Sequence, residues 1–110
     1  MTRNPMPAIT EKEFRQQIVD LARTLGWLAY WTWRSTHSPA GFPDLVLARE
    51  RIIFAELKTQ SGKLTEAQQE WITALREAGG CCYVWRPADW PSIVDVLTRK
   101  IPRVPNTEAI

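Results

Sequence analysis

The sequence predicts an α/β protein in which a mixed central β-sheet is flanked by helices. Helical periodicity and apolar, strand-like runs alternate in the order α-β-β-β-α-β-α along 110 residues. Residues 52–86 indicate a strand, a helix and a second strand, which normally form a right-handed parallel βαβ unit. The two apolar runs before that helix suit an antiparallel hairpin, so the sheet should contain both kinds of strand pairing.

The composition is that of one globular domain. The chain is 45% hydrophobic and 24% charged, which is too apolar for a disordered protein. No apolar run approaches the roughly 18 residues that span a membrane, and the N-terminus lacks a signal-peptide pattern, so we expect a cytoplasmic protein without a membrane partner. Residues 1–9 should form a flexible lead-in, residues 10–100 a single domain and residues 101–110 a flexible tail.

Charge and cysteine content constrain the function only weakly. The net charge is +2 and the basic residues are spread along the chain, which permits an anionic partner without requiring one. The adjacent Cys81 and Cys82 lack the spacing of a zinc site, and neighbours in a strand point to opposite faces, which disfavours a disulfide between them. We expect both thiols to be buried packing groups in a reducing compartment.

The first predicted helix runs from Glu11 to Leu25, with Thr10 as its N-cap and Gly26 just after its end. At about 100° per residue, Glu11 lies nearer the apolar stripe than Glu13 does, so Glu11 should border the core and Glu13 should face water. The stripe itself follows the i, i+3, i+4, i+7 rule and consists of Phe14, Ile18, Leu21, Ala22 and Leu25.

Two further helices are predicted in the second half of the chain. One begins after Thr65 as its N-cap, reaches about Ala78 and is stopped by the glycine pair that follows. A short last helix covers residues 91–100, with Pro91 near its first turn. The buried stripe of the longer helix is predicted at Leu64, Ala67, Trp71, Ala74 and Leu75.

Four apolar or aromatic runs predict the strands of the sheet, at residues 27–33, 44–48, 51–57 and 81–86. The charged segment Arg49 to Arg51 between the second and third runs suits a hairpin turn. A hairpin with this turn places Asp44 across from Glu56 or Lys58. These polar residues therefore meet at the open end of the hairpin.

Carboxylates that converge on one spot repel each other unless a proton or a cation lies between them. Glu56 and Lys58 are two residues apart in a strand and so project from the same face, while the Leu57 carbonyl stays close by. Oxygen donors of this kind suit Mg²⁺, and a nearby lysine can orient a water or stabilise charge on a phosphate. Charged residues at strand ends are also common as a solvated surface, and spacing alone leaves both interpretations open.

The spacing "FPD-x11-ELK" resembles the PD-(D/E)xK nuclease motif, with Pro43 and Asp44 as its first half and Glu56, Leu57 and Lys58 as its second. The wider pattern resembles the VRR-NUC (virus-type replication-repair nuclease) family over roughly residues 10 to 98. The segments that carry this resemblance are "TEKEF", "GFPDLVL", "ELKTQSGKLTEAQQEW", "LREAGG" and "VWRP".

The resemblance implies a restriction-endonuclease-like core and a set of site residues. Asp44, Glu56 and the Leu57 carbonyl would bind Mg²⁺ or Mn²⁺, and Lys58 would be the catalytic lysine. Glu11 would be the acid of the N-terminal helix, as a catalytic residue and a further metal ligand, and a helix glutamine, Gln68, would lie near the site.

The family resemblance also implies an activity and partners. Its members hydrolyse phosphodiester bonds in DNA, and its small stand-alone members, often phage-encoded, resemble Holliday-junction resolvases that act as homodimers. We therefore expect a metal-dependent endonuclease for branched DNA, acting as a homodimer in a bacterial or phage-infected cell. The alternatives are a non-catalytic nucleic-acid-binding module of the same fold and a restriction or repair nuclease without preference for junctions.

Several side chains have two interpretations at this stage. Gln68 follows Thr65 at the spacing of a capping box, in which it would bond back to the Thr65 backbone N–H, so a capping role and a site role both stay open. Phosphate contacts are predicted at His37, Arg34, Lys63 and Arg86, against the alternative that each is a structural or solvated residue.

Overall fold

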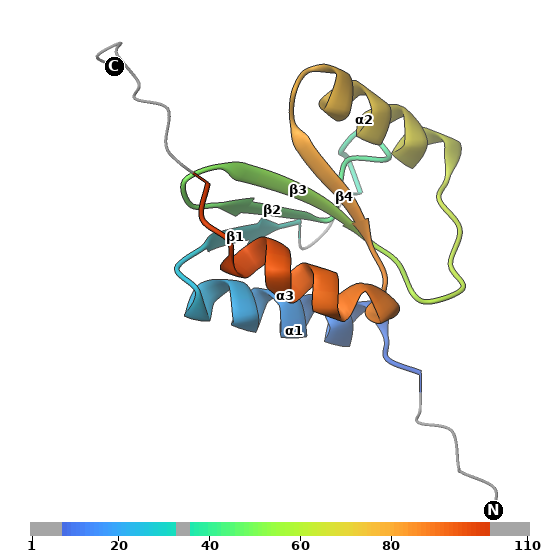
Figure 1. Cartoon of the computed structure of the whole chain (residues 1–110). Coiled ribbons are helices and arrows are strands. Elements are labelled where there is room, and N and C mark those ends of the chain that lie inside the picture. The colour runs from blue at the N-terminus through green and yellow to red at the C-terminus, as the bar shows by residue number, and fades with distance from the viewer. Residues whose placement is uncertain (1–7, 33–35, 102–110) are drawn as a thin grey trace, which may run out of the picture.

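The computed structural model describes residues 8–32 and 36–101 of the chain. Every predicted helix and strand is found in the predicted order, with ends that differ by one or two residues, and a short 3-10 helix at Pro87–Asp89 precedes the last helix (Figure 1). The predicted lead-in at 1–9 and tail at 101–110 lie almost entirely outside the described residues.

The sheet has four strands in the spatial order β1-β2-β3-β4. Strand β2 pairs antiparallel with both β1 and β3, whereas β3 and β4, which are connected through a helix, pair in parallel. The prediction of a mixed sheet is therefore confirmed. The strands are β1 (Leu28–Trp31), β2 (Leu45–Ala48), β3 (Ile52–Leu57) and β4 (Cys81–Trp85).

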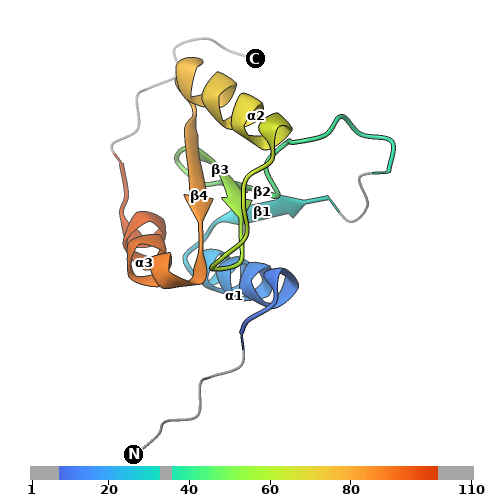
Figure 2. The ribbon, with the colours of Figure 1, turned by 90° about the vertical axis from the view of Figure 1, so that its right-hand side faces the viewer.

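The helices cover both faces of this sheet. Helices α1 (Glu11–Thr24) and α3 (Trp90–Thr98) lie on one face, and α2 (Glu66–Glu77) lies on the other, which gives three layers (Figures 1 and 2). Alternate side chains of β2 and β3 face α1 and α3 and are fully buried there, because successive residues in a strand point to opposite faces. This main core includes Leu45, Leu47, Ile53, Ala55 and Leu57 of the hairpin strands.

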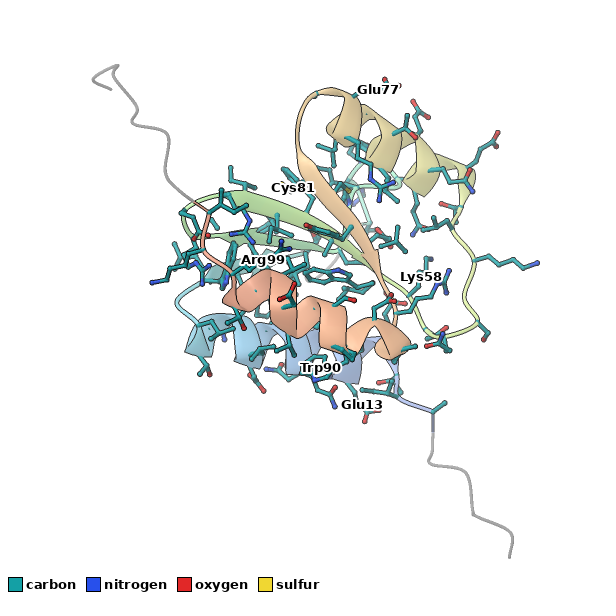
Figure 3. The ribbon with its side chains drawn as sticks, in the orientation of Figure 1. Glu13, Lys58, Glu77, Cys81, Trp90 and Arg99 are labelled. Atoms are coloured by element: carbon teal, nitrogen blue, oxygen red, sulfur yellow. The ribbon has the colours of Figure 1, made fainter. Side chains whose placement is uncertain are left out.

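Both long helices begin with a reciprocal capping box. The Thr10 hydroxyl accepts a hydrogen bond from the Glu13 N–H at 3.1 Å, and the Glu13 carboxylate accepts from the Thr10 backbone N–H at 3.4 Å. Thr65 and Gln68 form the same arrangement at the start of α2. Glu13 is exposed on α1, as predicted, and its capping role explains why an acid occupies that position (Figure 3).

The predicted helix stripes are only partly correct. In α1, Val19 is buried in addition to Phe14, Ile18 and Ala22, whereas Leu21 and Leu25 are half-buried, because the sheet and α3 together cover a wider face than one stripe. In α2 the single buried residue is Ile72, which the predicted stripe omits, and Ala74 is exposed. Helix α2 lies alone on its face of the sheet, so most of its apolar residues remain half-covered.

The turn between β2 and β3 binds the carboxyl ends of two helices. The Arg49 and Arg51 guanidinium groups both form ion pairs with Glu50 and both lie over the Trp27 ring, at 4.4 and 5.0 Å from its centroid. Such cations satisfy carbonyl groups that have no partner within a helix. The carbonyl oxygens that accept from the two arginines, at 2.7 to 3.2 Å, belong to Leu25, Val96, Leu97 and Arg99.

Cys82 is buried, as predicted, and burial raises the pKa of its thiol. Cys81 is only half-buried, because it lies at the first position of β4. Neither cysteine forms a disulfide, so both remain thiols within the described part of the chain.

Candidate active site

The register of the β2–β3 hairpin brings Asp44 and Glu56 together. Leu45 pairs with Ala55, so the next position outward places Asp44 opposite Glu56, which is one of the two pairings that the sequence allows. The Leu57 backbone N–H donates to Asp44 Oδ2 at 3.0 Å. The Asp44 side chain is therefore held over the end of β3, next to the Glu56 carboxylate.

Glu56 is a buried acid without a counter-charge in contact. It is 1% exposed and is the one charged residue that is buried within residues 8–32 and 36–101. Its Oε1 accepts from the Gln68 side-chain amide at 3.0 Å, whereas its Oε2 is buried without a hydrogen-bond partner among the described residues. Burial, together with the neighbouring Asp44 carboxylate, raises the pKa of Glu56 to about 9.

Gln68 forms the capping contact and also contacts the carboxylate pair, so the structure is compatible with both of the roles that the sequence left open. Its side-chain oxygen accepts from the Thr65 backbone N–H at 2.9 Å, and its side-chain nitrogen donates to Glu56. The two ends of one amide thus connect the start of α2 to the carboxylate in β3. Because the oxygen is occupied by a backbone donor, the nitrogen is the end that faces Glu56, and an acceptor is required there.

Two more predicted residues approach the carboxylate pair. Glu11 lies in the first turn of α1 and is exposed, so the prediction that it borders the core is wrong. Partial burial of its carboxyl group and then the charge of Asp44 raise its pKa, while the charges of Lys58 and Arg15 lower it. Lys58 follows β3 directly, is half-buried, and its charge also opposes the rise in the pKa of Glu56. The start of α1, the start of α2 and the end of β3 lie at the same end of the molecule (Figures 2 and 3).

The donor chemistry of this cluster fits a hard divalent cation. Within residues 8–32 and 36–101 there is no group of three or more His, Cys, Asp or Glu arranged to hold a metal, as a structural zinc site would require. Mg²⁺ commonly uses one or two protein carboxylates and completes its shell with water. Asp44 and the unpartnered Oε2 of Glu56 match that requirement, and a bound cation would remove the repulsion between the two carboxylates.

The segment before Asp44 is held tightly against α2. Gly41 has φ +96°, and a Cβ at this position would lie 2.4 Å from both the carbonyl carbon and the oxygen of Ala67. Only glycine combines this backbone conformation with so close an approach. No role was predicted for Gly41, although its position three residues before Asp44 in the sequence is a signal of a tight backbone approach.

The predicted phosphate contacts lie in different environments. Arg86 is engaged by the loop after Lys58, where its Nη1 donates to the Thr59 and Gly62 carbonyl oxygens at 2.7 and 2.6 Å. His37 and Lys63 are exposed. Arg34 lies outside the described residues.

The fold and the cluster together define a class of protein. The chain has the PD-(D/E)xK-like nuclease fold, which is a mixed four-stranded sheet with helices on both faces. At the open end of its hairpin lie Asp44, Glu56 and Lys58. The family model of the VRR-NUC domain matches residues 2–89, so the chain belongs to the VRR-NUC domain family.

Solved structures support the fold independently. A VRR-NUC domain protein superposes with a TM-score of 0.66 at 21% identity, over 82% of this chain and 86% of that one. The Holliday junction resolvase Hjc of Archaeoglobus fulgidus superposes with a TM-score of 0.50 at 23% identity, over 67% of this chain and 66% of its own. The comparison with curated proteins found no match. None of the helices described is long and apolar enough to cross a membrane.

Proposed function

We propose that this chain is a divalent-metal-dependent endonuclease that hydrolyses phosphodiester bonds in DNA. The observation that carries the proposal is the buried, unpartnered Oε2 of Glu56 beside Asp44. Burying one carboxylate next to a second one is costly for folding unless a cation or a proton is held between them. In a member of a nuclease family, a cation is the partner that gives this arrangement a use.

The chain's own residues divide the work of hydrolysis. Asp44, Glu56 and the Leu57 carbonyl would hold Mg²⁺ or Mn²⁺, which when bound supplies an activated water and neutralises charge on the phosphate. Lys58 orients the attacking water and stabilises the charge that develops on the phosphate oxygens. Gln68 fixes the rotamer of Glu56, and Glu11 adds a third acid at the edge of the site.

The proposed substrate is branched DNA, cut by a homodimer. The likeness to the Hjc fold supports this choice, since Hjc is a Holliday junction resolvase. An uncharged apolar area, which we call the open sheet face, supports the dimer. It lies on the α2 side of β1 and β3 and is formed by Leu28, Tyr30 and Ile52, which are 77%, 64% and 54% exposed.

A second copy of the chain is the occupant that suits the open sheet face. A two-fold dimer brings the same patch together with itself, and an uncharged apolar patch is complementary to its own copy but not to the DNA backbone. Sedimentation should therefore show a dimer, and Tyr30→Glu should dissociate it. Gln17→Glu adds the same charge on the exposed side of α1 and should leave the dimer intact. A monomeric wild-type protein would contradict this part of the proposal.

Cleavage of defined DNA substrates tests the activity. The full chain with Mn²⁺ should cut a four-way junction faster than a linear duplex of the same sequence, and chelation of the metal should stop the reaction. Equal rates on both substrates would remove the preference for branched DNA while leaving the nuclease assignment. No cutting of junction, flap or splayed DNA at any divalent-metal concentration would overturn the assignment itself.

A further inference from the structure

A pocket beside the carboxylate pair has no role in the chemistry described above. It has a volume of about 310 Å³ and lies between α1, the end of β1, the segment 38–43 and the first turn of α2. Asp44 and Gln68 are among its lining residues, so it adjoins the proposed metal site. The segment 38–43 contributes small or rigid lining residues, among them Pro39, Ala40 and Gly41.

Arg15 is the one cation among the described residues that line this pocket. It lies one helical turn after Glu11, and residues four apart share a face of a helix, so Arg15 points to the same side as that acid. Its guanidinium carbon lies 5.9 Å from the centroid of the Trp31 ring. Within residues 8–32 and 36–101 the guanidinium forms no hydrogen bond or ion pair, whereas those of Arg49 and Arg86 are occupied by backbone carbonyls.

The electrostatics of the site call for such a cation. Glu11, Asp44 and Glu56 place three carboxyl groups at the end of the sheet, and Lys58 is the one cation that the pKa shifts of these acids place close to both Glu11 and Glu56. A divalent cation offsets only part of the negative charge of these acids, so positive charge beside the metal site favours the approach of a DNA strand. The planar guanidinium of arginine matches two phosphate oxygens at once.

We propose that the pocket binds a phosphate group of the DNA strand, the one next to the scissile phosphate, and that Arg15 is the residue that holds it. This inference rests on the proposed function. The hydroxyl groups of Thr32 and Ser38, which also line the pocket, are further donors for the same phosphate. The volume is at the lower end of the range for ligand pockets, which suits one phosphate with its sugar.

The test compares Arg15→Gln with Arg23→Gln. Arg23 is a matched control, because it lies two turns further along α1 and also lies over the Trp31 ring, at 5.4 Å, but does not line the pocket. Binding of a labelled four-way junction is measured by fluorescence anisotropy in Ca²⁺ between 50 and 200 mM salt. Arg15→Gln should weaken binding by about tenfold at low salt and reduce the slope of log Kd against log salt by about one.

The controls decide what each result means. Arg23→Gln should leave the affinity within about twofold and the slope unchanged, and Arg15→Lys should restore the slope with part of the affinity. Circular dichroism confirms folding, and glutamine suits the helix. Equal losses in Arg15→Gln and Arg23→Gln, or a loss without a change in slope, would overturn the pocket assignment while the wild type still cuts DNA. A wild type that neither binds nor cuts DNA would overturn the proposed function, and this inference with it.

Discussion

The two ends of the β2–β3 hairpin carry charged residues with opposite consequences. At the turn, Glu50 is paired with the arginines on either side of it, which in turn bind the carbonyl groups of α1 and α3. At the open end, Glu56 faces Asp44 and keeps one buried oxygen without a partner. Lys58, which follows β3 at the open end, is labelled in Figure 3.

The pKa shifts express this difference directly. The hydrogen bond from Arg49 lowers the pKa of Glu50 to about 2, whereas burial and Asp44 raise that of Glu56 to about 9. Both residues are glutamates of the same hairpin, Glu50 in its turn and Glu56 in β3. A charge that is satisfied by the protein itself stabilises the fold, and a buried charge that is left unsatisfied marks a place where a ligand completes the structure.

The largest expected effect comes from the open end. Asp44→Asn should reduce the rate of DNA cleavage by about 10³-fold or more, because it removes one of two carboxylates that hold the metal. The fold should persist, since the asparagine oxygen can still accept from the Leu57 N–H. Single-turnover cleavage and thermal unfolding measure the two properties. Activity within tenfold of the wild type would show that the site is misassigned.

The converse change is made at the turn. Arg49→Met should lower the free energy of unfolding by about 3 kcal/mol, because it removes hydrogen bonds to three helix carbonyls and the contact with Trp27. Urea unfolding measures this loss. The cleavage rate per folded molecule should be unchanged. A variant that is as stable as the wild type but inactive would contradict the assignment of a structural role to the turn and a catalytic role to the open end.

The pH dependence of stability sharpens the comparison. The pKa of Glu56 in the folded protein is raised to about 9. In metal-free buffer the unfolded chain therefore loses this proton above about pH 4.5 while the folded protein keeps it, and this difference favours the unfolded state increasingly as the pH rises toward 9. Glu56→Gln should therefore increase the free energy of unfolding at pH 8 by on the order of 2 kcal/mol, and have no such effect at pH 4. Urea unfolding in EDTA is the measurement.

Glu50→Gln is the matched control at the turn, and its sign is opposite. The lowered pKa of Glu50 stabilises the folded state above about pH 4.5, and this contribution is lost as the pH falls toward 2. The variant should be less stable than the wild type at pH 7, with a difference that shrinks in acid. The same sign for both glutamine variants at neutral pH would remove the contrast between the two ends.

The smallest expected effects separate the two roles of Gln68. Thr65→Ala and Gln68→Ala should each cost about 1 kcal/mol of stability, since both break the capping box. Only Gln68→Ala releases Glu56, so only this variant should also weaken Mn²⁺ binding in isothermal titration calorimetry. Equal Mn²⁺ affinity in the two variants would leave Gln68 with the capping role alone.

The sequence by itself determined the order of elements, the mixed sheet and the meeting of Asp44 with either Glu56 or Lys58 at the open end of the hairpin. These features depend on local rules: the period of two in a strand, the position of the Arg49–Arg51 turn, and the glycines that end helices. Once the turn is placed, the register follows, and residues twelve apart become neighbours.

Only the tertiary structure decided which charged side chains are free. Arg86 and the turn arginines bind carbonyl groups 24 to 50 positions away in the chain, and Arg15 lies beside a pocket made from four separate segments. Gln68 likewise reaches Glu56 only because α2 packs against β3. No local pattern encodes such contacts, because they depend on how helices pack on the sheet. This packing decides which charged side chains bind backbone carbonyls and which remain available at the candidate site.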